Sequence, residues 1–300
     1  MARMIAIDWG TSSFRAYLLD DAGRILERRV AEMGVMAISN GGFADVIDSQ
    51  LPEWIDARTP RIVMSGMIGS RQGWKEVPYV CVPAGAAEIA AAMQEIGWGG
   101  RRKAWIVPGL ATRDAAGVPD VMRGEETQLL GVMTEVDDGP CTVCLPGTHS
   151  KWATLEGGRI VAFSTHMTGE TFAVLRRHSI LGRTMADGDD NDAAFDEGVS
   201  RARDHGGLLH HIFGMRARTL IGGLDGNAAR EYLSGVLIGH ELLSASGDAS
   251  PVHVVGATGL ARRYRRALES MGRTVNVVDA DGAATRGIFR LAQLRAAGGV

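Results

Sequence analysis

Two short stretches of this sequence share the pattern Gly-Thr-x-Ser, and each follows an apolar, strand-like segment. The first is DWGTSSFRAY, beginning at Asp8, and the second is LPGTHSKWAT, beginning at Leu145. Gly10-Thr11 aligns with Gly147-Thr148, and the serines and alanines that follow keep the same offset. Such a repeat at the openings of two similar stretches indicates internal duplication at the scale of a domain. The chain is therefore expected to fold into two related halves.

The order of predicted elements places the chain in the α/β class. Strands are expected at residues 4–10, 13–20, 25–35, 61–67, 103–110, 141–147, 251–260 and 274–280, and a hairpin over 150–167. Helical periodicity is present over 43–54, 83–98, 124–136, 229–245, 261–271 and 283–297. Polar turn residues at 137–140 predict domains at 1–138 and 139–300. Whether the C-terminal helix packs on the first domain is left open.

Composition limits the kind of protein that this chain can be. Of its 300 residues 45% are hydrophobic and 22% are charged, so a sizeable core is expected. The net charge of -3 argues against partners such as nucleic acids or anionic membranes, and no apolar run is long enough to cross a bilayer. Lacking a recognisable signal peptide and having only three cysteines, the chain is expected in the reducing cytoplasm. Cys141 and Cys144 have C-x-x-C spacing, but we interpret them as core residues.

Both Gly-Thr turns are candidate phosphate-binding sites. Backbone N–H groups and hydroxyls at the end of a strand, with no bulky side chain nearby, form a concave site for anions. The candidate residues are Gly10, Thr11 and Ser12 in the first turn and Gly147, Thr148 and His149 in the second. One such turn by itself is equally consistent with an ordinary hairpin. The repetition favours a pair of turns that grip a polyphosphate from both sides.

An acidic residue precedes only the first turn. Asp8 ends the apolar strand before the glycine, whereas Leu145 occupies the corresponding place in the second copy. A carboxylate at this point is suited to hold Mg²⁺, directly or through water, beside bound phosphates. A second carboxylate would repel the phosphates without adding a metal site. We therefore predict Asp8 as the metal-binding residue.

A third glycine-containing element follows the strand predicted at 251–260. Gly256, Thr258 and Gly259 open a helix, which suits a nucleotide base or ribose lying against backbone. Tight packing of the strand against the helix is the alternative, because G-x-x-G is a weak signal. No P-loop pattern G-x-x-x-x-G-K-[ST] occurs in the sequence.

Acidic and basic side chains in the first half are candidates for substrate chemistry. Glu125 and Glu126 start a predicted helix, and either one could accept a proton from an attacking hydroxyl. Alternatively they only complement the helix dipole, an effect of less than about 1 kcal/mol each. The candidates for binding a small anionic substrate are Ser70, Arg71, Lys75 and Arg123. For the cations, a solvated loop is the alternative.

Together these motifs resemble those of the acetate/sugar kinase, Hsp70 and actin superfamily. The segment Asp8-Trp9-Gly10-Thr11 is similar to its first phosphate motif, Pro146-Gly147-Thr148 to its second, and residues 255–259 to its adenosine motif. Within this superfamily the sequence is most similar to the 2-dehydro-3-deoxygalactonokinase family. The similar strings include MSGMIGSRQGWKEVPY, VMRGEETQLLG, LPGTHSKW and LSGVLIGHE, and they follow one another along almost the whole chain.

The resemblance implies a fold, an activity and its cofactors. The fold would be two ribonuclease H-like domains of the actin-like ATPase type, with a nucleotide cleft between them. The activity would be phosphorylation of the C6 hydroxyl of 2-dehydro-3-deoxy-D-galactonate in galactonate catabolism, with ATP and Mg²⁺; homo-oligomers are left open. The stretch GEETQLLG is also similar to the acid motif of exopolyphosphatases, which favours Glu125 or Glu126 as the base. The acid common in the superfamily's second phosphate motif is replaced here by Leu145 and Pro146.

Two other functions remain as alternatives. A phosphohydrolase of the exopolyphosphatase type would use water in place of the sugar acid. Its channel would be expected to carry more cations than a balance of 32 basic against 35 acidic residues suggests. A sugar-acid sensor without enzymatic activity is the second alternative, and the presence of Asp8 and Glu125 argues against it.

Overall fold

The chain folds into two compact units. The computed structural model describes residues 4–39, 41–55, 61–100, 102–245 and 251–297. The first unit comprises Met1–Pro140, Thr154–Phe163 and Asp279–Val300, and the second comprises Cys141–Ala153 and Ser164–Val278. Among the described residues, no helix has the length and apolar character needed to span a membrane.

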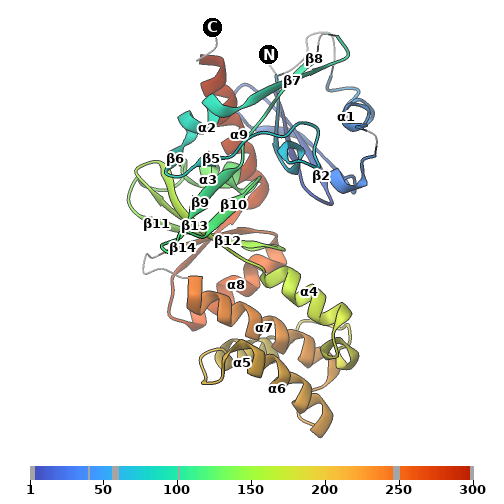
Figure 1. Ribbon diagram of the computed structural model, residues 1–300, viewed down its shortest axis with the longest axis vertical. Coiled ribbons are helices and arrows are strands. Elements are labelled where there is room, and N and C mark those ends of the chain that lie inside the picture. Colours follow the sequence, from blue (N-terminus) through green and yellow to red (C-terminus); the bar gives the residue numbers. More distant parts are fainter. Residues whose placement is uncertain (1–3, 40, 56–60, 101, 246–250, 298–300) are drawn as a thin grey trace. The chain divides into compact units, whose positions relative to one another are not determined.

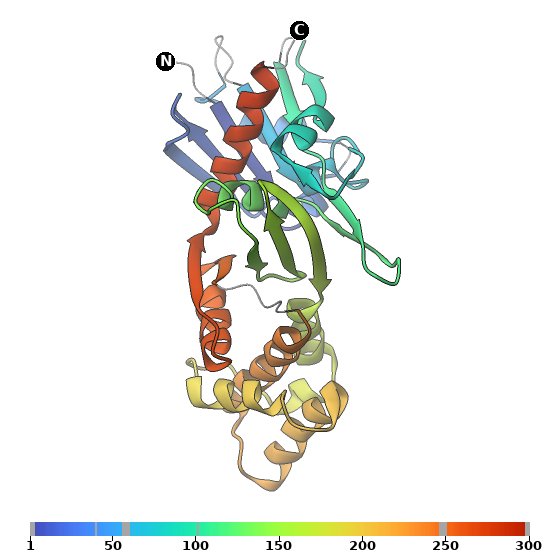
Figure 2. The same cartoon turned by 90° about the vertical axis from the view of Figure 1, so that its left-hand side faces the viewer.

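A mixed six-stranded sheet forms the centre of the first unit (Figure 2). Its order is β3-β2-β1-β4-β8-β7, from β1 at Met4–Trp9, β2 at Phe14–Leu19, β3 at Ile25–Ala31, β4 at Arg61–Gly66, β7 at Gln94–Trp98 and β8 at Arg102–Ile106. β1 pairs antiparallel with β2 and parallel with β4. The carboxyl ends of β1 and β4 therefore lie at the same edge, which is where open α/β sheets bind ligands.

A second six-stranded sheet repeats this strand order. It runs β15-β14-β11-β12-β13-β6, from β6 at Ala84–Gly85, β11 at Cys141–Leu145, β12 at Ser150–Glu156, β13 at Arg159–His166, β14 at Val252–Gly256 and β15 at Val275–Asp279. The series β13-β12-β11-β14-β15 matches β3-β2-β1-β4-β8, and β14 is parallel to β11 as β4 is to β1. The duplication predicted from the sequence is thus confirmed in the strand order.

Smaller elements complete the first unit. Its helices are α1 at Phe43–Gln50, α2 at Ala86–Ala92, α3 at Glu125–Val132 and α9 at Ala280–Ala297, with 3₁₀ turns η1 at Val35–Ala37 and η2 at Met67–Gly69. A three-stranded sheet of order β10-β9-β5 consists of β5 at Val80–Cys81, β9 at Leu110–Arg113 and β10 at Pro119–Met122.

The two faces of β1 have different surroundings. Ile5 and Ile7 belong to a buried apolar cluster that includes residues of α1. Side chains alternate along a strand, so Asp8 points to the opposite face. On that face Tyr17 of β2 donates a hydrogen bond of 2.7 Å to Asp281 of α9. Asp8 therefore lies on the side of the sheet that α9 covers.

The helices α3 and α9 pack with their backbones in contact. A Cβ atom placed on Gly287 of α9 would lie 1.8 Å from the carbonyl oxygen of Thr127 in α3. Conversely, a Cβ on Gly131 of α3 would lie 1.9 Å from the carbonyl oxygen of Ala283 in α9. These distances are far shorter than a van der Waals contact, so both positions need glycine. The close approach secures α9 to the helix that carries Glu125 and Glu126.

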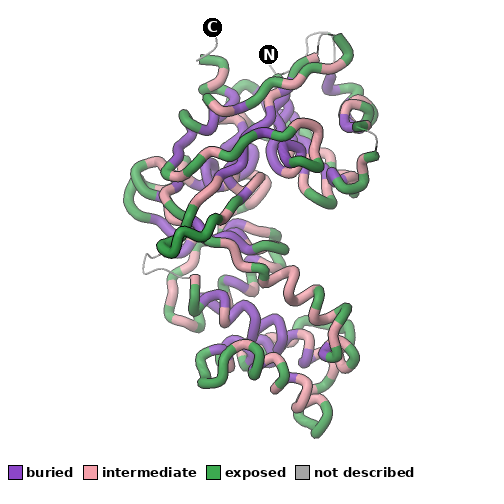
Figure 3. The backbone as a smooth tube through the Cα atoms, viewed as in Figure 1, coloured by how far each residue is buried: buried purple, intermediate pink, exposed green. Residues whose placement is uncertain are grey.

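Most of the second unit is helical (Figure 1). The helices are α4 at Thr168–His178, α5 at Asp192–Arg201, α6 at Gly207–Ile221, α7 at Gly226–Ala245 and α8 at Thr258–Ser270, with a 3₁₀ turn η3 at Leu181–Thr184. The middle of α7 is buried, which Figure 3 shows in purple. Cys141 and Cys144 of β11 are buried and free, in agreement with their interpretation as core residues.

One sequence-based prediction is wrong in the first unit. The helix expected over 83–98 ends at Ala92, and Gln94–Trp98 forms strand β7 instead. β7 pairs antiparallel with β8, with Trp98 opposite Arg102. Hydrogen bonding to a neighbouring strand overrides the local helical periodicity, which a single sequence cannot reveal. The strands of the β10-β9-β5 sheet were also not expected, apart from the start of β9, because they are short.

The contact between α3 and α9 predicts that Gly287→Ala destabilises the protein. The added methyl group must push two helix backbones apart, and overpacking of this kind costs roughly 1–3 kcal/mol or more. Gly214→Ala in α6 is the matched control, because nothing lies within 4 Å of its Cβ position. It should raise stability by about 0.5–1 kcal/mol through helix propensity. Thermal unfolding of both variants measures the difference, and equal midpoints would contradict the packing argument.

Candidate active site

The first Gly-Thr turn lies at the carboxyl end of β1. The Gly10 N–H donates a hydrogen bond of 2.8 Å to the carbonyl oxygen of Ser13, and Thr11 and Ser12 at the tip are exposed. The backbone at Gly34 packs against this turn. A Cβ atom on Gly34 would lie 2.2 Å from the carbonyl oxygen of Thr11, so only glycine fits. The backbone N–H groups of the turn thus stay on an open surface, as an anion site requires.

The second Gly-Thr turn has the same construction. It follows β11, and Thr148 and His149 are exposed. A Cβ atom on Gly169 would lie 2.3 Å from the carbonyl oxygen of Gly147. The Glu170 N–H also donates a hydrogen bond of 2.9 Å to the carbonyl oxygen of Thr148. The Thr168-Gly169-Glu170 segment, which had no role assigned from the sequence, therefore supports this turn.

Glu170 also brings a carboxylate to the second turn. Its side chain contacts His149 Nε2, and both side chains are partly exposed. The residue of the second turn that aligns with Asp8 is Leu145, so the aligned positions show no acid before Gly147. The structure supplies one from the start of α4 instead. The only sequence signal for this residue is the acid in the string MTGE, residues 167–170.

Asp8 is surrounded by groups from three elements of the first unit. Its Cα partners are Arg15 on β2 and Ser65 on β4. The Arg15 Nη1 atom lies 3.2 Å from Asp8 Oδ2. Burial raises the pKa of the Asp8 carboxyl, Arg15 counteracts this, and the negative charge of Asp281 adds to the increase. A cation bound beside Asp8 would relieve the cost of a buried negative charge.

Glu126 is a buried acid on the same edge of the sheet. It follows Gly124, whose φ of 114° turns the chain into α3. Its carboxyl accepts hydrogen bonds of 2.6 Å from the Gly124 N–H and 3.2 Å from Ser65 Oγ. Burial and the neighbouring charge of Glu125 raise its pKa to about 8. Since Ser65 is the strand partner of Asp8, the predicted residues Asp8 and Glu126 do come together.

Glu125 differs from Glu126 in exposure. Glu126 is 0% exposed, whereas Glu125 is partly exposed. Glu125 Oε2 accepts a hydrogen bond of 3.0 Å from the Arg123 N–H. Both acids therefore fold back on the turn that precedes α3, but only Glu125 reaches the surface.

The four candidate residues for substrate binding lie in neighbouring loops of the first unit. Arg71 is exposed and paired with Glu76, and Lys75 donates to the carbonyl oxygen of Glu95. Ser70 is buried, and its hydroxyl donates to the carbonyl oxygen of Met67. The cations Arg71 and Lys75 are therefore already engaged by other groups.

Arg123 stands apart from these residues. Its guanidinium stacks on the ring of Tyr79 at 4.3 Å, and Nη2 donates to the carbonyl oxygen of Val77 at 2.8 Å. Its Nε and Nη1 atoms are buried and have no hydrogen-bond partner among the described residues. Buried donors without partners are rare in folded proteins and call for a ligand or water.

The candidate adenosine element is open to solvent. β14 ends at Gly256, and α8 begins at Thr258. Thr258 and Gly259 are exposed, and nothing lies within 4 Å of a Cβ placed on Gly259. The free N–H groups of the first turn of α8 are thus accessible, which suits a polar or anionic ligand.

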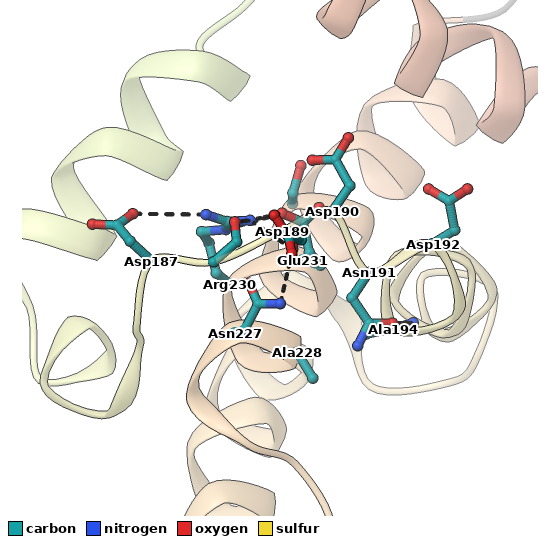
Figure 4. Close-up of polar contacts among 12 residues, drawn as sticks. Asp187, Asp189, Asp190, Asn191, Asp192, Ala194, Asn227, Ala228, Arg230 and Glu231 are labelled. Atoms are coloured by element: carbon teal, nitrogen blue, oxygen red, sulfur yellow. Dashed lines mark hydrogen bonds and ion pairs between the residues drawn. The ribbon is translucent and has the colours of Figure 1, made fainter.

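Arginines neutralise an acidic loop, residues 187–192, in the second unit. Figure 4 shows Arg230 of α7 between Asp187 and Glu231, and its Nη2 also donates to backbone oxygens of the loop. Asp190 is paired with Arg262 and Arg263 of α8. The network ties the loop to α7 and α8, so this acidic loop serves to hold helices together.

The described part of the chain contains no group of three or more His, Cys, Asp or Glu residues suited to a metal ion. Mg²⁺ usually keeps several waters and is bound by one or two carboxylates together with substrate phosphates. Asp8, partly exposed beside the first turn, fits such an ion. The Nδ1 atom of buried His211 lies 3.0 Å from Nε2 of His240.

The duplicated strand order defines the class of protein. The chain has the actin-like ATPase fold, with two sheets of the same strand order. The chain belongs to the family described as 2-keto-3-deoxy-galactonokinase, whose model matches residues 8–291.

Known proteins are similar over nearly the full length of the chain. A probable 2-dehydro-3-deoxygalactonokinase of Rhizobium meliloti (strain 1021) is 43% identical and covers 96% of each chain. The 2-dehydro-3-deoxygalactonokinase of Escherichia coli (strain K12) is 36% identical over 97% of this chain and 98% of its own. A crystal structure from Sinorhizobium meliloti, described as a 2-dehydro-3-deoxygalactonokinase protein, has a TM-score of 0.90. It is 42% identical and covers 99% of this chain and 100% of that chain.

The supporting glycines predict that Gly34→Ala and Gly169→Ala weaken nucleotide binding. Each added methyl group collides with a turn backbone, so the N–H groups of that turn must move away from their positions. We expect the Kd for ADP, measured by calorimetry, to rise by on the order of tenfold, which corresponds to about 1.4 kcal/mol. Gly214→Ala is again the control. Unchanged ADP affinity in both variants would show that the turns do not depend on these contacts.

Proposed function

We propose that this chain is an ATP-dependent kinase for 2-dehydro-3-deoxy-D-galactonate. It transfers the γ-phosphoryl group of ATP to the C6 hydroxyl and forms 2-dehydro-3-deoxy-6-phospho-D-galactonate. The reaction is a step of galactonate catabolism and takes place in the cytoplasm. The observation that carries this proposal is the family match over residues 8–291, which includes all of the candidate site residues. Asp8 near the end of β1 and the acids Glu125 and Glu126 at the start of α3 support it, because they provide groups that phosphoryl transfer needs.

In this proposal the glycine turns bind the nucleotide. Backbone N–H groups and hydroxyls of Thr11 and Ser12, in the turn that the hydrogen bond from Gly10 to Ser13 closes, hold phosphate oxygens in the first unit. Those of Gly147 and Thr148 do so in the second. His149, held by Glu170, is placed to contact a phosphate oxygen. The open start of α8, with Gly256, Thr258 and Gly259, takes the adenosine. These groups fix the position of the phosphates, and positioning accounts for much of the catalysis of phosphoryl transfer.

Asp8 is the residue that would hold Mg²⁺. When bound, the ion neutralises charge on the phosphates and polarises the transferred group. Arg15 holds the Asp8 carboxylate in place by its ion pair, and Ser65 on β4 lies beside it. A single carboxylate is consistent with an ion that is held mainly by phosphate and water.

Arg123 is the best candidate to bind the carboxylate of the sugar acid. Its two unpartnered nitrogen atoms offer donors of the kind that carboxylates accept. Arg71 is exposed and paired with Glu76, and Lys75 is partly exposed and donates to the carbonyl oxygen of Glu95. Arg123 is also next in sequence to the turn that begins α3, so a substrate bound to it lies near the two glutamates.

Glu125 is proposed as the general base and Glu126 as its support. A base must come within hydrogen-bond distance of the hydroxyl that it deprotonates, and geometry decides before pKa. Glu126 is fully buried and occupied by Ser65 and Gly124, whereas Glu125 reaches the surface. Glu126 therefore holds the turn at Gly124 in the conformation that presents Glu125.

A coupled assay that detects ADP tests the proposed kinase activity. ADP formation from ATP should require the keto-acid, and the galacto epimer should be phosphorylated faster than the gluco epimer. Asp8→Asn is the inactive control, because it removes the charge beside the phosphates while it keeps the size of a partly exposed side chain. Phosphate release that is fast and independent of the keto-acid would instead identify a phosphohydrolase. Binding of the keto-acid without any ADP formation would identify a sensor.

The two glutamates should respond differently to substitution by glutamine. Glu125→Gln should lower kcat by about 10²- to 10⁴-fold, the usual effect of losing a general base. Glu126→Gln should retain much more activity, because an amide can also bond to Gly124 and Ser65. If Glu126 were the base instead, the kcat/KM of the native protein would fall as the pH drops below about 8, where this acid takes up a proton.

The raised pKa of Glu126 should also make the stability of the folded protein depend on pH. The pKa of Glu126 is about 8 in the folded protein, whereas the ordinary value of about 4.5 applies to the unfolded chain. As the pH rises, the unfolded chain therefore loses this proton at a lower pH than the folded protein does. The folded protein therefore loses stability as the pH rises from about 4.5 to about 8. Glu126→Gln removes this loss, and its advantage in thermal unfolding should grow over that pH range. A constant difference in unfolding temperature would contradict the assigned pKa.

A further inference from the structure

Glu241 is a buried acid in the second unit that the proposed mechanism does not use. It lies near the end of α7 and is 3% exposed. Its Oε1 atom accepts hydrogen bonds from Ser150 Oγ at 2.7 Å and from Trp152 Nε1 at 2.8 Å. Its Oε2 atom accepts one from the Tyr264 hydroxyl at 2.7 Å. All three donor residues are buried as well.

The three donors belong to two nucleotide-binding elements. Ser150 and Trp152 are in the first part of β12, directly after the turn of Gly147, Thr148 and His149. Tyr264 is in α8, whose exposed first turn contains Thr258 and Gly259. All of these residues belong to the second unit. One carboxyl group thus connects the second phosphate turn with the helix of the adenosine element.

Burial of this acid is costly without compensation. Removing a carboxylate from water is unfavourable unless charges or hydrogen bonds replace the lost hydration. Glu241 forms no ion pair with any described residue, and three neutral donors supply the compensation. Burial, followed by the charge of Glu241, raises the pKa of both the Cys144 thiol and the Tyr264 hydroxyl. The compensation for burying Glu241 therefore depends on this set of hydrogen bonds.

A merely stabilising core would not need an acid here. A well-packed apolar group is often as stabilising as a buried polar network, which is retained where it defines one geometry. The carboxyl group does what an apolar group cannot do: it sets the distance and direction between two separate elements through bonds at both of its oxygen atoms. Those two elements are the ones that the proposed function assigns to the nucleotide.

We propose that Glu241 is a positioning residue for ATP, which fixes the second phosphate turn relative to the start of α8. This inference rests on the proposed kinase function. It deepens that function by assigning an effect on the nucleotide alone to a residue whose side-chain hydrogen bonds are made to Ser150, Trp152 and Tyr264. Loss of the carboxyl group should therefore impair the use of ATP and leave the handling of the sugar acid unchanged.

Steady-state kinetics of Glu241→Gln tests the proposal. Glutamine keeps the size of the side chain, but its amide nitrogen cannot accept a hydrogen bond. Either Tyr264 or the pair Ser150 and Trp152 therefore loses its acceptor. We expect the KM for ATP to rise at least tenfold and the KM for the keto-acid to stay within about twofold. Tyr264→Phe, which removes one donor and is expected to fold, should show a smaller increase in the same parameter. Glu241→Asp should restore part of the affinity.

A matched control separates positioning from stability. Leu181→Ala truncates a buried residue of another apolar cluster of the second unit, one that contains none of the hydrogen-bonded residues. It should lower the unfolding temperature but leave both KM values unchanged. If Glu241→Gln and Tyr264→Phe behave like this control, with lower stability and native KM for ATP, the positioning role is overturned.

Calorimetry with ADP makes the test independent of the kinase reaction. The Kd for ADP should rise in Glu241→Gln and Tyr264→Phe but not in Leu181→Ala. Native protein that binds ADP but does not phosphorylate the keto-acid would refute the proposed substrate, while weakened binding in the variants would still support the positioning role. Equal ADP affinity in the native protein and both network variants would refute the positioning role alone.

Discussion

The parallel pairing of β1 with β4 is the constraint on which the chemistry of the first unit depends. Their register places Asp8 opposite Ser65, and the Ser65 hydroxyl reaches Glu126. A shift of one residue would turn Asp8 into the apolar cluster on the other face, because side chains alternate along a strand. The register is secured by the apolar residues Ile5 and Ile7, which are completely buried. Packing of the core therefore determines where the acids of the site lie.

Close backbone contacts form a second common feature of the structure. Gly34 and Gly169 lie against the two Gly-Thr turns, and Gly287 lies against α3. In each case the space left for a side chain is smaller than a methyl group. Rigid support from behind leaves the backbone N–H groups of a turn free to face a ligand without having to be ordered when it binds. Such preorganisation reduces the entropic cost of binding.

Buried acids in the two units have different environments and different roles. Glu126 has a raised pKa because burial and the charge of Glu125 both disfavour its ionised form. Glu241 receives three hydrogen bonds from side chains, and these compensate its burial. The first acid lies beside the proposed base, and the second joins β12 to α8 by hydrogen bonds. The environments of the two carboxyl groups therefore differ in the number and kind of hydrogen-bond donors around them.

The sequence by itself determined the parts of this protein that depend on neighbouring residues in the chain. These are the paired Gly-Thr turns, the doubled strand pattern, the acid at Asp8 and the acidic start of α3, together with the family resemblance. Only the tertiary structure decided which glutamate is buried, which glycines support the turns, and that Gln94–Trp98 is a strand. It also placed residues 279–300 in the first unit and Glu241 between β12 and α8. Burial and close approach depend on segments far apart in the sequence, and no local pattern encodes which of them meet.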